Sequence, residues 1–179
     1  MNVLDTMATR RSTRKYLDRQ VEKEKIATIL KAAYAAPVGH SAYKDLHLSV
    51  VQNQDLLQKT AAYSGQAFGN AKYNPFYGAP TLIIVSAKPK EDEQLVYIAD
   101  VGCIMENMQL AATELGLGCV YLWAMLNRIT PCPDLIQALN LPEGYQAISA
   151  LALGYPETPL PQRTLDDIPA ERIATTFVD

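Results

Sequence analysis

The segment 93–115 constrains the fold most, because it predicts one long helix that is apolar on most of its faces. Its apolar residues are Leu95, Val96, Ile98, Ile104, Met105, Met108, Leu110, Ala111 and Leu115. Gly116 and Gly118 follow this segment and predict the end of the helix. A helix without a polar face has to be covered, so we expect it in the centre of the core or in an interface between copies of the chain.

Helices and strands are predicted to alternate around this segment. Periodicity predicts further helices over 3–9, 22–35, 56–63 and 133–139, and strands over 46–51, 81–87, 119–124 and 145–153. Alternation of this kind, taken alone, favours a parallel sheet. After Gly154, prolines recur along the chain, and residues 155–179 are therefore predicted to run as an extended arm. We expect residues 1–179 to form one domain.

Composition excludes several classes of protein. The 179 residues are 49% hydrophobic and 20% charged, which is typical of a globular chain. A net charge of −3 argues against a nucleic-acid-binding protein. The most apolar runs are much shorter than the ~20 residues of a membrane span, and no signal peptide is visible. Three cysteines without C-x-x-C spacing predict reduced thiols and a cytoplasmic location.

A cluster of cations lies near the start of the chain. Arg10, Arg11, Arg14 and Lys15 fall within six residues, and the hydroxyl of Ser12 lies between them. Guanidinium groups and a hydroxyl donor match the oxygen atoms of a phosphate group. On the residues alone, a solvated surface run is the simpler interpretation of the same cluster.

Catalytic groups borne by side chains are scarce. The chain has no G-x-S-x-G motif and only two histidines, and neither histidine has a metal-ligand partner at the usual spacing. Gly116-Leu117-Gly118 lacks the third glycine of a dinucleotide fingerprint and precedes a predicted strand. The scarcity indicates a protein that takes its chemistry from a cofactor.

Five stretches, in order, resemble the nitroreductase-like family of flavin mononucleotide (FMN) enzymes, and they span almost the whole chain. They are Arg10 to Tyr16, Ala35 to His40, Tyr77-Gly78-Ala79-Pro80, Asp100-Val101-Gly102 through Gly118, and Leu153-Gly154-Tyr155-Pro156 with Arg163 and Leu165-Asp166-Asp167-Ile168. The loop Pro37-Val38-Gly39 is similar to a smaller branch of that family.

The resemblance implies an α+β sandwich in place of a parallel sheet, with a mixed, mostly antiparallel sheet flanked by helices. It also implies a homodimer that exchanges its C-terminal arm and binds FMN at the interface. The implied reaction takes hydride from NAD(P)H and reduces nitroaromatics, quinones or similar small acceptors in two steps. Three alternatives remain open: a relative dedicated to one substrate, a flavin-binding redox sensor without turnover, and an anion-binding module without flavin.

The resemblance also implies roles for the cations. Arg10 and Ser12 correspond to ligands of the FMN phosphate, and Arg163 in the arm is similar to a further phosphate-binding arginine. Arg14 corresponds to the cation near the N1/O2 edge of the flavin, where reduction places negative charge. Its structural alternative is an ion pair with a helix carboxylate such as Glu22. Arg11 faces either solvent or the phosphate.

The remaining implied flavin contacts lie in three other segments. They are Pro37, Val38, Gly39 and His40 in the loop, Asn70 in the segment 65–77, and Tyr121, Trp123 and Ala124 after Gly118. The loop has Val38, Ser41 and Tyr43 where many relatives have other polar residues, which indicates contacts through its backbone groups. The segment 65–77 is the expected lid. The alternative for Trp123 is a packed core aromatic.

Overall fold

The computed structural model describes residues 2–90, 94–169 and 172–178. Its α-helices are α1 (Val3–Thr9), α2 (Lys23–Tyr34), α3 (Gln54–Ala67), α4 (Gln94–Glu114), α5 (Ala124–Asn127) and α6 (Pro133–Leu139). Its strands are β1 (Leu46–Val51), β2 (Thr81–Ala87), β3 (Gly118–Leu122) and β4 (Gln146–Gly154). Short 3₁₀ helices lie at η1 (Gly39–Ser41), η2 (Tyr43–Asp45) and η4 (Leu165–Asp167).

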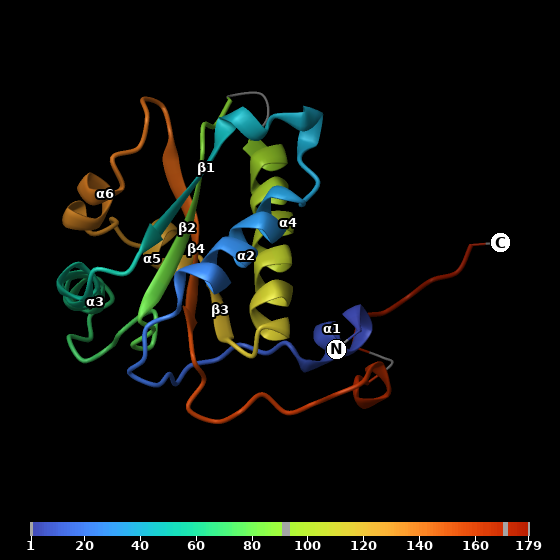
Figure 1. Cartoon of the computed structure of the whole chain (residues 1–179). Helices are drawn as coiled ribbons and strands as arrows, with labels where there is room; N and C mark the ends of the chain where they lie inside the picture. Colours follow the sequence, from blue (N-terminus) through green and yellow to red (C-terminus); the bar gives the residue numbers. More distant parts are fainter. Residues whose placement is uncertain (1, 91–93, 170–171, 179) are drawn as a thin grey trace.

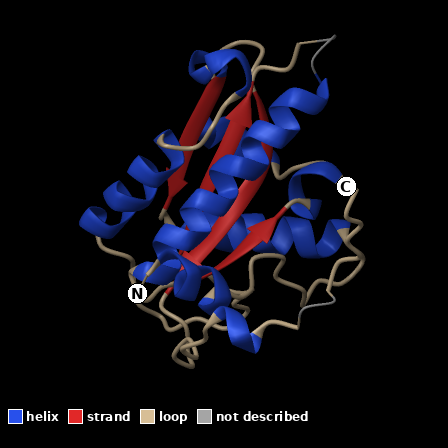
Figure 2. Cartoon of the chain, turned by 90° about the vertical axis from the view of Figure 1, so that its right-hand side faces the viewer, coloured by secondary structure: helices blue, strands red, loops and turns tan. Residues whose placement is uncertain are grey.

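The strands form one sheet in the order β1-β2-β4-β3, and each neighbouring pair of strands is antiparallel. Helices α2 and α4 cover one face of the sheet, and α3 and α6 cover the other (Figures 1 and 2). The parallel sheet that alternation favoured is wrong, because local patterns carry no information on which strands pair. The α+β sandwich with an antiparallel sheet, which the family resemblance implied, is confirmed.

The sequence of strand β2 is apolar without alternation because both faces of the strand are buried. Leu82, Ile83, Ile84 and Val85 are each 0% exposed. Leu82 and Ile84 belong to the core on the α3 side, and Ile83 and Val85 belong to the core on the α4 side. A strand buried on both faces reads as a continuous hydrophobic run.

The helix ends follow the expected capping chemistry. The Asn53 side chain caps α3 by accepting the N–H of Leu56. Helix α4 ends at Glu114, and two residues later Gly116 has a φ of 73°, in the left-handed region that glycine tolerates. There the N–H of Leu117 donates to the carbonyl of Ala112 at 2.9 Å, which satisfies one of the last helical carbonyls.

Helix α4 buries one side and leaves apolar residues on another. Five of its exposed or half-buried residues form a stripe at helical spacing, which we call the α4 stripe: Leu95, Ile98, Ala99, Gly102 and Cys103. Leu95 is 82% exposed, and nothing lies within 4 Å of a Cβ placed on Gly102. Within the described ranges, no helix is long and apolar enough to cross a membrane.

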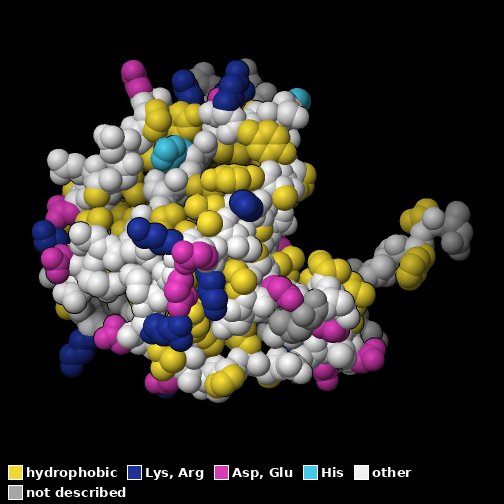
Figure 3. All heavy atoms as spheres, in the orientation of Figure 1, with side chains coloured by type: hydrophobic (Ala, Val, Ile, Leu, Met, Phe, Trp, Pro, Cys, Tyr) yellow, Lys and Arg dark blue, Asp and Glu magenta, His cyan; other side chains and the backbone are white. Residues whose placement is uncertain are grey.

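The C-terminal segment runs beside the N-terminal stretch before it leaves the body of the molecule (Figure 1). The N–H of Leu17 donates to Tyr155 O at 2.9 Å, and the N–H of Glu157 donates to Lys15 O at 3.2 Å. Residues 172–178 then project outward with apolar side chains on their surface (Figure 3). Among them Phe177 is 87% exposed, which is unusual for an aromatic residue that has no partner surface.

A small polar cluster fixes the end of β4 to the start of α2. The Tyr155 hydroxyl donates to Glu22 Oε2 at 2.6 Å, and Arg19 Nη2 lies 2.6 Å from Glu22 Oε1. The Arg19 guanidinium also lies 4.0 Å from the centroid of the Tyr155 ring. The hydrogen bond from Tyr155, with that from Arg19, lowers the pKa of Glu22 from 4.5 to about 2.

The lowered pKa of Glu22 predicts a pH-dependent contribution to stability. A carboxyl whose pKa is lower in the folded state stabilises the protein above its unfolded pKa, and this contribution is lost as the pH falls from 4.5 towards 2. We expect Glu22→Gln to lower the Tm at pH 7 and the gap from wild type to narrow as the pH falls. Thermal unfolding of both proteins at several pH values measures this difference in Tm. A gap that stays constant down to pH 3 would contradict the assignment.

Candidate functional site

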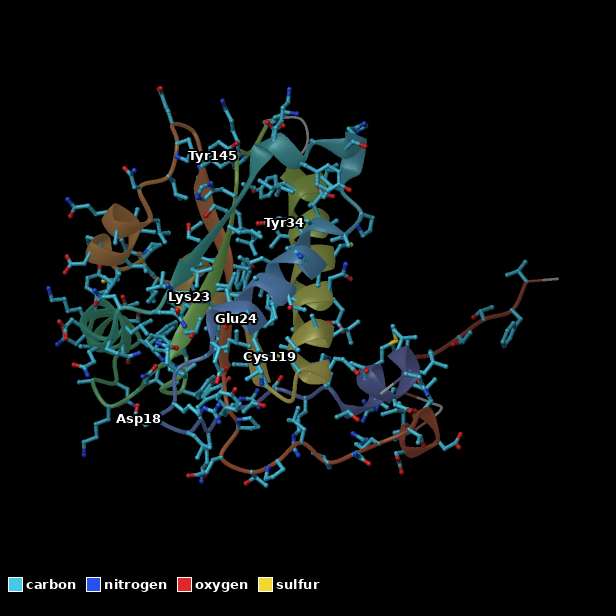
Figure 4. The ribbon with its side chains drawn as sticks, in the orientation of Figure 1. Asp18, Lys23, Glu24, Tyr34, Cys119 and Tyr145 are labelled. Atoms are coloured by element: carbon cyan, nitrogen blue, oxygen red, sulfur yellow. The ribbon has the colours of Figure 1, made fainter. Side chains whose placement is uncertain are left out.

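The cationic stretch lies along the free edge of β3. Ser12 forms an isolated parallel bridge with Cys119, and the N–H of Thr13 donates to Cys119 O at 2.9 Å. A Cβ on Gly118 would lie 2.6 Å from Thr13 Cγ2, so glycine permits this close approach. Figure 4 labels Cys119 at the lower end of α4, where the N-terminal chain passes. The backbone of the stretch is therefore fixed to the sheet.

The side chains of this stretch line an open groove with a volume of about 360 Å³. One wall comes from the N-terminal stretch and the other from the C-terminal segment; the lining residues are Arg11, Ser12, Thr13, Arg14, Lys15, Pro156, Thr158 and Leu160. Arg10 follows the last residue of α1, and its Nε lies 3.5 Å from Glu106 Oε1 on α4. Arg11 is exposed beside the groove.

The C-terminal segment brings Arg163 to the end of α1. The N–H of Arg163 donates to the Thr9 hydroxyl at 3.2 Å, so its main chain lies next to the residue that precedes Arg10. Its guanidinium donates to Asp167 O at 2.8 Å. The main chains of Arg10 and Arg163, which are far apart in the sequence, therefore lie close together at the end of α1.

Arg14 is held by groups that the sequence did not indicate. Its Nη1 lies 3.5 Å from Ser12 O, and its Cζ lies 5.6 Å from the centroid of the Tyr77 ring. The alternative ion pair with Glu22 is wrong, because Glu22 bonds to Arg19 and Tyr155.

Tyr77 itself has a φ of 59°, which is unfavourable for a residue with an aromatic side chain. The pKa of the neighbouring Tyr73 is raised by burial and by a hydrogen bond with Tyr77. The position of Tyr77 at the start of a Tyr-Gly-Ala-Pro motif was the one available signal for it.

The segment 65–77 combines a helix end with turns. Helix α3 continues to Ala67, four residues beyond the predicted end, and Phe76 anchors the rest in the core at 2% exposure. Asn70 lies in a turn, where its Oδ1 accepts the N–H of Lys72 at 3.1 Å. The segment reaches the cationic stretch through Tyr77.

Two aromatic side chains at the end of β3, Tyr121 and Trp123, are accessible. Trp123 is 47% exposed, so the alternative of a packed core aromatic is wrong. The Tyr121 hydroxyl lies 2.9 Å from Ser149 Oγ on β4. Ala124, predicted as a strand residue, begins the short helix α5, which was missed because four residues are too few to show a period.

The loop Pro37–His40 lies elsewhere on α4. The N–H of Gly39 donates to Asp100 Oδ1 at 2.8 Å, whereas Arg10 contacts Glu106. Six residues along a helix separate these contacts by about 9 Å in height and about 120° in direction. Within one chain, the structure therefore attaches the loop and the cations to different faces of the same helix.

The Cys119 thiol and the Tyr16 hydroxyl, close to the cationic stretch, stay neutral near pH 7. Burial raises the pKa of the Cys119 thiol to about 12, and burial also raises the pKa of Tyr16. Neither group can then serve as a nucleophile or base at neutral pH. No cluster of His, Cys, Asp and Glu suited to a metal ion occurs in residues 2–90, 94–169 and 172–178. The arrangement is suited to binding a phosphorylated cofactor.

Comparison with known proteins gives consistent matches. A model of the nitroreductase family matches residues 7–155. An Archaeoglobus fulgidus protein named for NADH dehydrogenase/NAD(P)H nitroreductase activity is 35% identical over 86% of this chain and 85% of its own. A Methanothermobacter thermautotrophicus protein of the same name is 32% identical, over 87% of this chain and 78% of its own. A Bacteroides fragilis nitroreductase crystallised with bound FMN has a TM-score of 0.78 and 29% identity, covering 99% of this chain and 100% of its own.

Proposed function

Because this chain belongs to the nitroreductase family, we propose that it is an FMN-dependent oxidoreductase. It takes electrons from NAD(P)H and reduces nitroaromatics, quinones or similar small acceptors. The observation that carries this proposal is the groove in which the cationic stretch and the C-terminal segment form opposite walls. The names of the relatives and the FMN-bound neighbour support the same reaction class.

The donors in and beside this groove fit the phosphate of FMN, although the Arg163 side chain lines a neighbouring cavity with Asp5 and Asp167. Arg10 and Ser12 supply charged and neutral donors on a backbone fixed by β3, and Arg163 is attached beside them through Thr9. Arg11 lines the same groove. A phosphate dianion leaves water only when such charge-assisted donors replace its hydration. These residues would hold the phosphate end of the cofactor.

Arg14 would act at the other end of the cofactor. When bound, FMN supplies two-electron redox chemistry that passes electrons from NAD(P)H to the acceptor. The Arg14 guanidinium, which lies over the Tyr77 ring, would stabilise negative charge at the N1/O2 edge of a bound flavin. Asn70, Tyr121, Trp123 and Ala124 are the proposed contacts to the ring. The protein contributes binding and electrostatics, which agrees with its scarce acids and bases.

A second copy of the chain completes the site. The α4 stripe is apolar and exposed, and its spacing continues to Glu106, the partner of Arg10. Packing two α4 stripes together brings the cations of one chain near the loop Pro37–His40 of the other, which removes the separation seen within one chain. A homodimer with FMN at its interface therefore uses all the proposed contacts.

The arm gives this dimer a second area of contact. Within the described residues, no strand lies on the outer side of β1. Residues 172–178 place Ile173 and Phe177 at even spacing, as in a strand with one apolar face. We place the arm, residues 155–179, against the partner copy as part of one FMN-binding domain spanning 1–179. Three free thiols suit the reducing cytoplasm.

The visible spectrum of the purified protein tests the proposal. We expect flavin bands at about 370 and about 450 nm, bleaching by NADH or NADPH without oxygen, and return of colour when a quinone or nitroaromatic is added. A protein that stays colourless after incubation with FMN would overturn flavin binding. A yellow protein that neither nicotinamide reduces would overturn the enzymatic role and leave a flavin-binding sensor.

A further inference from the structure

The loop after α2 has an unfavourable backbone conformation at its centre. His40 has a φ of 53° and Ser41 a φ of 54°, so two successive residues with side chains lie in the left-handed region. Such conformations persist only where the surrounding structure holds them. The N–H of Ser41 donates to Val38 O at 3.1 Å, which closes the turn but does not attach it to the body of the protein.

One side chain attaches the centre of this loop to α4. Asp100 is 9% exposed, and its Oδ1 accepts the N–H of Gly39 at 2.8 Å. Gly39 packs tightly against α4, because a Cβ on Gly39 would lie 2.6 Å from Val96 Cγ1. The loop therefore sits directly on α4, and its position depends on a buried carboxylate 61 residues away in the sequence.

The flanks of the loop have separate attachments. The Tyr43 hydroxyl donates to Ala36 O at 3.1 Å, and Lys90 Nζ lies 3.1 Å from Asp45 Oδ2. Asp45, Lys88 and Lys90 line the small cavity that also contains Gly39 and Asp100. These contacts hold the two ends of the loop, whereas Asp100 holds the middle, where the unfavourable residues begin.

We propose that Asp100 is a positioning residue for the flavin site. Through Gly39 it holds Val38 and His40 at the place where they meet FMN bound to the partner copy; this inference rests on the proposed function. The N–H of Gly39 donates to Asp100, so it does not donate to the flavin. The contacts from this loop then come from Val38 and His40.

The experiment measures FMN release from the purified holoprotein by the recovery of free flavin fluorescence. We expect Asp100→Ala to release FMN on the order of 10- to 100-fold faster, because a charge-assisted hydrogen bond is lost. Asp100→Asn keeps an oxygen that accepts the N–H of Gly39, so its release rate should return to within a few-fold of wild type. Asp45→Asn removes the ion pair with Lys90 at one end of the loop and leaves the attachment of Gly39 intact, so its release rate should change far less than that of Asp100→Ala.

A second pair of variants moves the loop while leaving Asp100 unchanged, so the result does not depend on how Asp100→Ala affects folding. Gly39→Ala should release FMN faster, because its Cβ displaces the loop from Val96, and adding Val96→Ala should slow the release again. Wild-type release and an unchanged flavin spectrum in both Asp100→Ala and Gly39→Ala would overturn the inference, as would equal losses in Asp45→Asn and Asp100→Ala. A wild-type protein without flavin would instead overturn the proposed function.

Discussion

Replacing Arg10 and Ser12 together by alanine is expected to give a folded protein that no longer retains FMN. In the proposed site the two side chains supply charged and neutral donors to the phosphate, so their loss should weaken binding by roughly 2–4 kcal/mol, or about 30- to 1,000-fold in Kd. The ratio of flavin to protein absorbance measures retention, and quenching of FMN fluorescence gives the Kd.

The double variant should fold because its main contacts are kept. Ser12 bridges Cys119 through its main chain, and the ion pair of Arg10 with Glu106 is partly exposed, so its loss should cost about 0–1 kcal/mol. Lys59→Ala is a matched control, since it removes an exposed cation that pairs with Asp134 on the other face of the sheet. A double variant with the flavin content of wild type would show that other residues bind the phosphate.

Replacing Gly102 by glutamine is expected to separate the two copies of the chain. Nothing lies within 4 Å of the new Cβ inside one chain, and removing a glycine from a helix should stabilise that chain by about 0.5–1 kcal/mol. In a symmetric dimer each chain places this side chain in the α4 stripe, so the interface contains two copies of the substituted residue. We expect a dimer at least about 100-fold weaker that also loses FMN, measured by sedimentation over a range of concentrations.

The control for this variant adds the same side chain elsewhere. Ala62→Gln lies on an exposed position of α3, on the opposite face of the sheet, and should leave the dimer unchanged. Circular dichroism should show that the helix content of Gly102→Gln is retained. If Gly102→Gln assembles with the affinity of wild type, the α4 stripe is not the interface.

Local signals in the sequence predicted most elements and missed how they pair. The bounds of α1, β1, β2 and α6 agree with the predicted ranges because each has a cap, a proline or a clear run of apolar residues at its ends. Helix α3 extends further than predicted because Ser64 and Gly65 do not stop it. The predicted start of the helix at Glu93 lies outside the described residues.

The site was predictable where its residues are close in sequence. The cationic stretch stands out because four cations fall within six residues. The contacts that hold it do not stand out, since Tyr77 meets Arg14 and Asp100 meets Gly39 only after the chain has folded. A pattern of neighbouring residues cannot predict a pair that tertiary packing brings together. The assigned flavin contacts remain predictions.

The open side of β1 has a consequence for a chain that has not yet found its partner. Strand β1 ends the sheet order, and no strand of the described residues pairs with its outer edge, where backbone N–H and C=O groups lie beside Val50, which is 39% exposed. Such an edge can pair with any extended segment that reaches it, which makes newly synthesised single chains prone to aggregate. Yield of usable protein should therefore depend on how quickly copies assemble, and slow synthesis at low temperature with ample riboflavin would favour it.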